Sequence, residues 1–248
     1  MSFIRKALEM ISPGRVGTRP AGIVLKESIV FYLKYIIISF AIIVLLLILS
    51  RVLGIEIQNV NSLKGTKSER FIYSVVLMTI IGPLMEESIF RLWNSFRREH
   101  VMISLFVISY ILLTKCIPHG HNVVVGSIQS DYFEFPILKF VLSLVTASSM
   151  LLIKETRLRN FASNYGHIII LISIIVFALL HLTNVRCDWY VYPFLVCMCL
   201  PQFILGVSVT NLRLNIGFWA GCVFHCVINL ITILLSSGDK IAELFQMF

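Results

Sequence analysis

The chain has 248 residues, of which 58% are hydrophobic and 14% are charged, and its formal net charge is +8. Soluble domains average roughly 45–50% apolar and 25% charged residues, so this composition excludes an ordinary soluble protein and predicts one that is integral to a membrane. The positive charge requires no nucleic-acid partner, because lysine and arginine gather at the ends of apolar runs, where they face anionic lipid headgroups.

The first 27 residues form a basic segment that lacks the long apolar stretch and the cleavage site of a signal peptide. Ile4, Leu8 and Ile11 recur at helical spacing, so this part could lie along the membrane surface, and a mobile tail fits the same residues. We expect residues 1–27 to be a cytoplasmic segment. Residues 28–248 should form one transmembrane domain, since no linker or internal repeat divides them.

Apolar runs of membrane-spanning length follow one another from residue 29 onward, separated by more polar connections. They predict an all-α fold, a polytopic transmembrane helical bundle of about seven spans. Basic residues are more frequent in the segments that a cytoplasmic N-terminus places inside, which favours that orientation in a bacterial inner membrane. The runs are approximately 29–53, 71–96, 101–117, 135–153, 166–182, 189–209 and 216–235.

The second run contains Glu86, Glu87 and Arg91, although ionisable groups at that depth are costly. Glu87 and Arg91 are four residues apart, so they share a helix face and can pair, whereas Glu86 points about 100° away from Glu87. The preceding Gly82-Pro83 step predicts a kink or a fresh helix start, because proline lacks an N–H and clashes with the carbonyl four residues back. Glu86 is therefore the unpaired carboxylate, and a purely structural polar cluster is the alternative.

Two later runs each contain a histidine, His181 and His225, and Asn229 follows the second one turn later. At 1.5 Å per residue from the inner ends of their helices, Glu86 and both histidines lie at similar depth. Glu86 could activate a water with the help of His181 and then protonate a leaving amine, while His225 and Asn229 donate hydrogen bonds to an oxyanion. The alternatives are satisfied core histidines and an interhelical hydrogen bond from Asn229.

Other candidate ligands and nucleophiles are better explained without chemistry. Small thiols suit close helix packing, and two histidines in a loop are usually solvated polar residues. We therefore interpret the cysteines near the last two runs as packing residues and expect no metal at the loop histidines. The residues concerned are Cys197, Cys199, Cys222, Cys226, His119 and His121.

Three short motifs, in this order and each inside an apolar run, resemble those of the CPBP family of intramembrane proteases. They are Glu86-Glu87-x-x-x-Arg91, Phe177-x-x-x-His181 and His225-x-x-x-Asn229. The family includes the CAAX prenyl endopeptidases and the Abi-type bacterial proteins linked to bacteriocin processing and immunity. The resemblance covers approximately residues 71–235 and implies a CAAX-protease-like membrane core within the domain 28–248.

The resemblance also implies a role for each motif residue. Glu86 would activate water together with His181, and His225 and Asn229 would supply the oxyanion site. Glu87 and Arg91 would support them. The expected partners are the lipid bilayer and a peptide or protein substrate at the membrane. The chain differs from the family pattern because the runs 101–117 and 135–153 are inserted between the first and second motifs.

No cofactor is expected. Zinc could in principle bind Glu86, His181 and His225, but no HExxH or other ligand pair on one helix is present, and the amide of Asn229 is a poor zinc ligand. Two other functions stay open as alternatives. One is a non-catalytic immunity or scaffold protein that retains the motifs, and the other is a proton-coupled transporter, against which no internal repeat is apparent.

Overall fold

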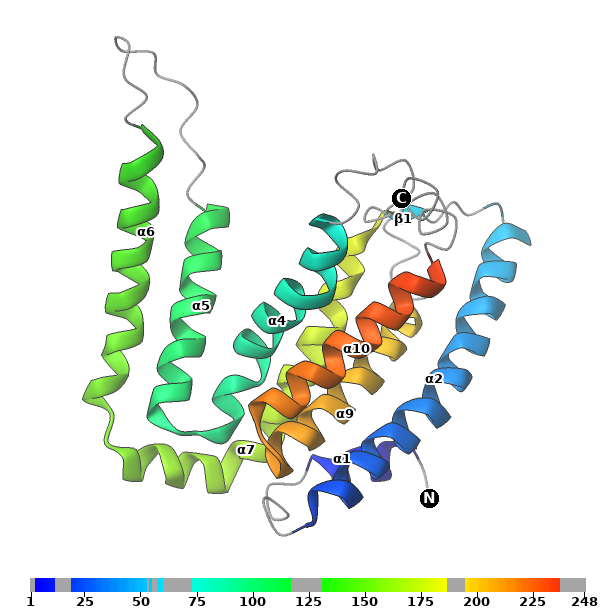
Figure 1. The fold of residues 1–248 in the computed structure, drawn as a ribbon, viewed down its shortest axis with the longest axis horizontal. Helices are drawn as coiled ribbons and strands as arrows, with labels where there is room; N and C mark the ends of the chain where they lie inside the picture. Colours follow the sequence, from blue (N-terminus) through cyan, green and yellow to red (C-terminus); the bar gives the residue numbers. More distant parts are fainter. Residues whose placement is uncertain are drawn as a thin grey trace, which may run out of the picture. The chain divides into compact units, whose positions relative to one another are not determined.

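The computed structural model describes residues 3–11, 19–52, 54, 58–59, 73–116, 131–186 and 195–236. These residues are almost entirely helical (Figure 1), which confirms the expected all-α fold. The two-residue strands β1 (Gln58–Asn59) and β2 (Val185–Arg186) pair antiparallel. The chain divides into two compact units, a first unit of residues 1–86 and 167–248 and a second unit of residues 87–166.

Within the described residues, a helix occupies each of the seven predicted apolar runs. Short 3₁₀ turns, η3 (Leu92–Ser95), η4 (Ser149–Leu152), η5 (His181–Asn184) and η7 (Val196–Cys199), extend or connect several of them. The main helices are α1 (Phe3–Met10), α2 (Ala21–Val52), α4 (Gly82–Phe90) preceded by the π-helix η2 (Leu77–Ile81), α5 (Arg98–Cys116), α6 (Asp131–Ser148), α7 (Glu155–Leu180), α9 (Leu200–Asn215) and α10 (Phe218–Ser236).

Five helical stretches of the described chain are long and apolar enough to cross a membrane. They are Ala21–Val52, Tyr73–Phe90, Glu155–Thr183, Val196–Asn215 and Phe218–Leu235. The apolar stretch Ile137–Leu152 of α6 and η4 is shorter. The total of about seven spans therefore stays approximate, while the nature of the fold as a transmembrane helical bundle is clear.

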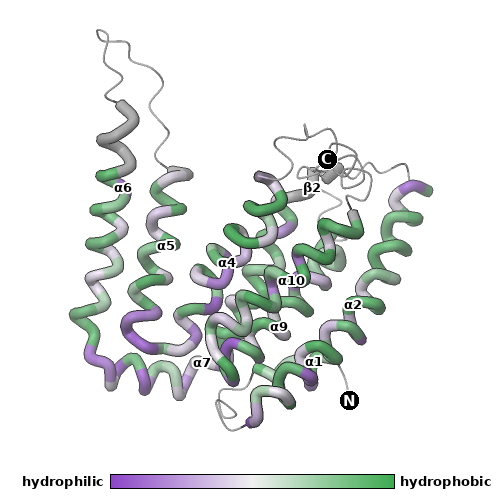
Figure 2. The backbone as a smooth tube through the Cα atoms, in the orientation of Figure 1, coloured by the Kyte–Doolittle hydropathy of each residue, from purple (hydrophilic) through white to green (hydrophobic). Residues whose placement is uncertain are grey.

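The surface of α2 shows whether water or lipid surrounds the protein. Its most apolar window has a mean hydropathy of 2.7, yet only 11% of that window is buried inside the protein. The side chains of Ile37, Phe40 and Leu45 are each about two-thirds exposed. Figure 2 shows hydrophobic residues along most of this helix. Water would penalise such a surface, whereas hydrocarbon would not. The chain is an integral membrane protein.

The core of the first unit is built around α9, which packs against both α2 and α10. Every residue from Ile204 to Arg213 is buried. Polar side chains in this stretch bond within the protein: Ser208 Oγ donates to the carbonyl of Ile204 at 3.0 Å, and Asn211 Nδ2 donates to Ser28 Oγ of α2 at 2.9 Å. The bond between Asn211 and Ser28 joins two helices and favours one relative placement of α2 and α9, because a membrane offers these side chains few other partners.

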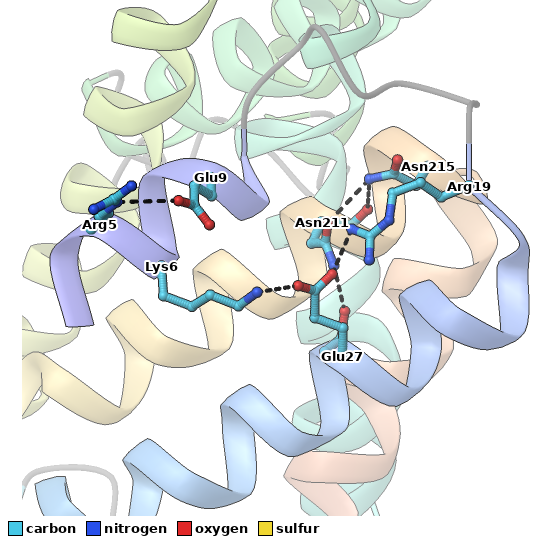
Figure 3. A network of polar contacts seen from close by, with 8 residues as sticks. Arg5, Lys6, Glu9, Arg19, Glu27, Asn211 and Asn215 are labelled. Carbon is cyan, nitrogen blue, oxygen red and sulfur yellow. Dashed lines mark hydrogen bonds and ion pairs between the residues drawn. The ribbon is translucent and has the colours of Figure 1, made fainter. Parts of the chain in front are cut away.

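The basic N-terminal segment contains a helix, α1, which is tied to α2 by charge (Figure 3). Glu27 of α2 accepts hydrogen bonds from Lys6 of α1 and, at 2.6 Å, from Nη1 of Arg19. The ring of Phe3 packs against aromatic rings of α2 and α9, including Phe31 at 5.8 Å between centroids. The position of α1 at the membrane surface stays a prediction.

The three apolar residues that mark α1 have different surroundings. Ile11 is 1% exposed, but Ile4 and Leu8 are 68% and 45% exposed, because Ala7 and Met10 form the buried side of the helix together with Ile11. Helical spacing alone identified a set of apolar residues, but it did not show which of them face the neighbouring helices.

The second unit contains α5 and α6, which run side by side in opposite directions (Figure 1). The rings of Phe106 and Phe140 meet edge to face at 5.2 Å, and Arg98 donates to the carbonyl of Ile153 at 2.9 Å. Phe96 has a left-handed φ of 52° where the chain leaves η3 and turns into α5. The predicted inserted pair of runs therefore forms a helical hairpin.

A close approach of α10 to α9 depends on Gly221. A Cβ atom at this position would lie 3.0 Å from Val209 Cγ1 and 3.3 Å from the Val209 carbonyl oxygen. We expect Gly221→Leu to lower the free energy of unfolding by about 1–3 kcal/mol, the usual cost of overpacking. The measurement is thermal unfolding of the purified protein in detergent.

The matched control for this prediction is Gly22→Leu in α2, where no atom lies within 4 Å of an added Cβ. This variant should unfold at nearly the temperature of the wild type. Equal unfolding temperatures for the two leucine variants would show that the approach of α10 to α9 does not depend on the missing side chain.

Candidate active site

The helix that contains the acidic pair passes through a π turn before it reaches Glu86. The N–H of Gly82 donates to the carbonyl of Leu77, five residues back, and Pro83 follows inside α4. The chain stays helical through this step, so the alternative of a fresh helix start is wrong. An extra residue in the turn accommodates the proline, and π turns of this kind are frequent at functional sites.

Glu86 and His225 face each other in the first unit. The Oε2 atom of Glu86 lies 3.5 Å from the Nε2 atom of His225. The His225 side chain is 2% exposed, while that of Glu86 is 33% exposed. A buried imidazole thus holds one side of the carboxylate, and the other side is accessible. The accessible side suits a base that must receive a proton from a reactant. The distance of 3.5 Å is longer than a typical hydrogen bond, as is common at active sites without a bound substrate.

His181 follows the last residue of α7 and begins η5. Its Nδ1 atom lies 2.9 Å from the carbonyl oxygen of Phe177. Because a carbonyl oxygen only accepts, Nδ1 must carry the hydrogen, and in the neutral ring Nε2 is then an acceptor. The local helix geometry therefore selects the tautomer that can accept a hydrogen bond from water.

The ring of Phe177 contacts both histidines. Its centroid is 4.9 Å from that of His181 and 5.9 Å from that of His225, with interplanar angles of 71° and 88°. Phe177 is 1% exposed. The ring places both imidazoles against one apolar wall. Among the described residues, no hydrogen bond or ion pair joins His181 directly to Glu86.

Asn229 lies one turn after His225 on α10, and its side chain points to η2, the π turn that precedes Glu86. Its Nδ2 atom donates a hydrogen bond to the carbonyl of Met78 in η2, with a distance of 3.1 Å. Sequence reasoning did not identify Met78, because a main-chain acceptor leaves no signature in its own side chain. The Gly82-Pro83 step was the available signal, since a proline inside a helix leaves a carbonyl that needs another donor.

Glu87 and Arg91 form a buried pair in the second unit. Arg91 Nη1 donates to Glu87 Oε1 at 2.6 Å, and each side chain is 1% exposed. The pair that the spacing of four residues predicts is present. Neighbouring carboxylates of one helix thus have different surroundings, since Glu87 is neutralised by a guanidinium and Glu86 faces an imidazole.

The remaining candidates are four cysteines and two loop histidines. The four cysteines that the structure describes form no disulfide bond; they are Cys197, Cys199, Cys222 and Cys226. His119 and His121 lie outside the described residues. In the described part of the chain no three side chains of histidine, cysteine, aspartate or glutamate converge as metal ligands.

Fold and site together define a class of protein, an all-helical integral membrane protein whose separate helices bring a carboxylate and histidines together. A family model described as type II CAAX prenyl endopeptidase Rce1-like matches residues 68–231. The chain belongs to this family of CAAX-type intramembrane endopeptidases. The comparisons with curated proteins and with solved structures found no match.

Proposed function

We propose that the chain hydrolyses a peptide bond of a membrane-associated substrate, with a water activated by Glu86 as the nucleophile. The observation that supports this most directly is the approach of Glu86 Oε2 to His225 Nε2 at 3.5 Å, on a carboxylate that is one-third exposed. The family match supports the reaction class. The assignment of individual roles is our inference from geometry and chemistry.

In the first step Glu86 takes a proton from water, and the hydroxide attacks the carbonyl carbon of the peptide. His181 accepts a hydrogen bond from the same water through Nε2, because its Nδ1 is engaged by the Phe177 carbonyl. The π electrons of the carbonyl become a lone pair on oxygen. The C–N bond then breaks, and Glu86 returns the proton to the leaving amine, so the products are a carboxylic acid and an amine.

His225 stabilises the oxyanion of the tetrahedral intermediate by donating from Nε2, and Asn229 can donate from the amide N–H that does not bind Met78. The negative charge near His225 moves during this step. Glu86 loses its charge when it takes the proton, just as charge develops on the substrate oxygen. The Nε2–H of His225 is therefore attracted to the oxyanion when the oxyanion forms.

The experiment that tests the function compares peptides released by cells of the native host with those released by a strain that carries Glu86→Ala. We expect at least one peptide whose new terminus is missing in the variant strain. Identical peptide sets, together with an unchanged phenotype, would favour an immunity or scaffold protein that retains the motifs. Proton-coupled solute uptake by liposomes containing only this protein would favour a transporter.

The proposed site lies in a bacterial inner membrane with the N-terminus in the cytoplasm. The basic segment supports this orientation, because Lys6 and Arg19 gather at the start of α2, near the end that should face anionic headgroups. Fusion of a reporter that is active only in the cytoplasm to the N-terminus should give a positive signal. A signal only from a periplasmic reporter would reverse the orientation.

Metal removal is expected to leave the activity intact, because the mechanism above requires only carboxylate, imidazole and amide groups. We predict that the purified protein contains substoichiometric zinc and still cleaves its substrate after exhaustive treatment with a strong chelator. Elemental analysis and the residual cleavage rate provide the two measurements. Stoichiometric zinc, with chelator inactivation that only Zn²⁺ reverses, would contradict this prediction.

A further inference from the structure

The carbonyl of Met78 receives no donor from the backbone of its own helix. In α register it would accept the N–H of Gly82, and in π register the N–H of residue 83. The Gly82 N–H donates to Leu77 instead, and residue 83 is a proline, which has no N–H. A carbonyl without a donor is costly in a membrane, because no bulk water replaces the missing bond.

Asn229 supplies that donor from another helix. Its Nδ2 atom lies 3.1 Å from the Met78 oxygen, although the two residues are 151 positions apart in the sequence. Residues 79–85 connect Met78 to Glu86, and one turn of α10 connects Asn229 to His225. The acidic helix and α10 therefore meet twice, once through Met78 and Asn229 and once through Glu86 and His225.

We propose that Asn229 is a positioning residue that holds the π turn at Leu77–Ile81 and thereby fixes the direction of Glu86. Successive helical residues are rotated by about 100°, so a change from π to α register would turn Glu86 by roughly that angle relative to the preceding turn. Its carboxylate would then leave His225. The consequence for catalysis rests on the proposed function, whereas the stabilisation of the π turn does not.

The structural role is tested by coupling between positions 229 and 83. Asn229→Leu removes the donor and should lower the unfolding temperature by about 4 °C or more. Pro83→Ala restores a backbone N–H that can reach the Met78 carbonyl. In the Pro83→Ala background we therefore expect Asn229→Leu to lower the unfolding temperature by less than half as much. Equal losses in the two backgrounds would overturn the proposal.

The matched control is Asn215→Leu. The Asn215 amide also donates to a main-chain carbonyl, that of Asn211 at 2.9 Å, but it lies in α9 and has no link to Pro83. Asn215→Leu should lower the unfolding temperature by the same amount with and without Pro83→Ala. If Asn229→Leu does not accumulate in membranes, Asn229→Ser is used in the same cycle, because its hydroxyl is too short to reach Met78.

Positioning is separated from oxyanion donation by kcat/KM measured in the same two backgrounds. Loss of an oxyanion donor alone lowers kcat/KM by the same factor with and without Pro83→Ala. If Asn229 acts by holding the π turn, Pro83→Ala restores a donor to the Met78 carbonyl, so Asn229→Leu should lower kcat/KM by a smaller factor in that background. Equal factors in the two backgrounds would restrict Asn229 to oxyanion donation. Because the unfolding cycle needs no activity, the two proposals can fail independently.

Discussion

Replacement of Glu86 by alanine is expected to reduce peptide cleavage by at least about 10²-fold, the usual effect of removing a general base. His181→Ala should cause a loss of similar size, because the water would lose its second partner. The measurement is kcat/KM of the purified protein in liposomes, with unfolding temperatures recorded to show that both variants are folded.

The matched control is Glu155→Gln. Glu155 is also a helical glutamate paired with a basic side chain, Arg159 at 2.7 Å, but its side chain is 52% exposed and it lies outside the site. We expect wild-type cleavage from this variant. Full biological activity of both Glu86→Ala and His181→Ala would refute the enzymatic mechanism and favour the scaffold alternative.

The buried pair in the second unit should dominate stability. Arg91→Leu leaves Glu87 charged and buried without its partner, at a cost of about 3–5 kcal/mol. We expect little folded protein from this variant. The double variant Glu87→Met/Arg91→Leu should recover most of the stability, because an apolar pair of similar volume replaces both charges. The yield of monodisperse protein and the unfolding temperature provide the measurements.

Arg159→Leu is the control for this experiment, since it breaks an exposed pair of the same spacing. Exposed pairs contribute about 0–1 kcal/mol, so this variant should behave like the wild type. If Arg91→Leu is equally stable, the Glu87–Arg91 pair is not required for folding. Its role would then have to be sought in activity.

The sequence was sufficient to predict the helices and the pairing within one helix. Long apolar runs have one stable form in hydrocarbon, and residues four apart on a helix share a face, so the pairing of Glu87 with Arg91 needed no tertiary information. The same rule showed that Glu86 points elsewhere. It could not show which group Glu86 meets, because depth along a helix does not determine the rotation of the neighbouring helices.

Contacts between distant segments explain what sequence reasoning missed. The local Gly82-Pro83 step signals an interruption of the helix, but the donor to the Met78 carbonyl is Asn229, which lies 151 residues later and is not indicated by any local pattern. The approach of His225 to Glu86 was likewise not predicted, because the rotation of α10 relative to the helix of Glu86 is not determined by local sequence.

The aromatic ring that contacts both histidines also makes their positions depend on one another. Phe177 meets each imidazole near edge to face and is almost completely buried. A change of side-chain volume at position 177 would therefore displace His181 and His225 together, although the two histidines lie on different helices.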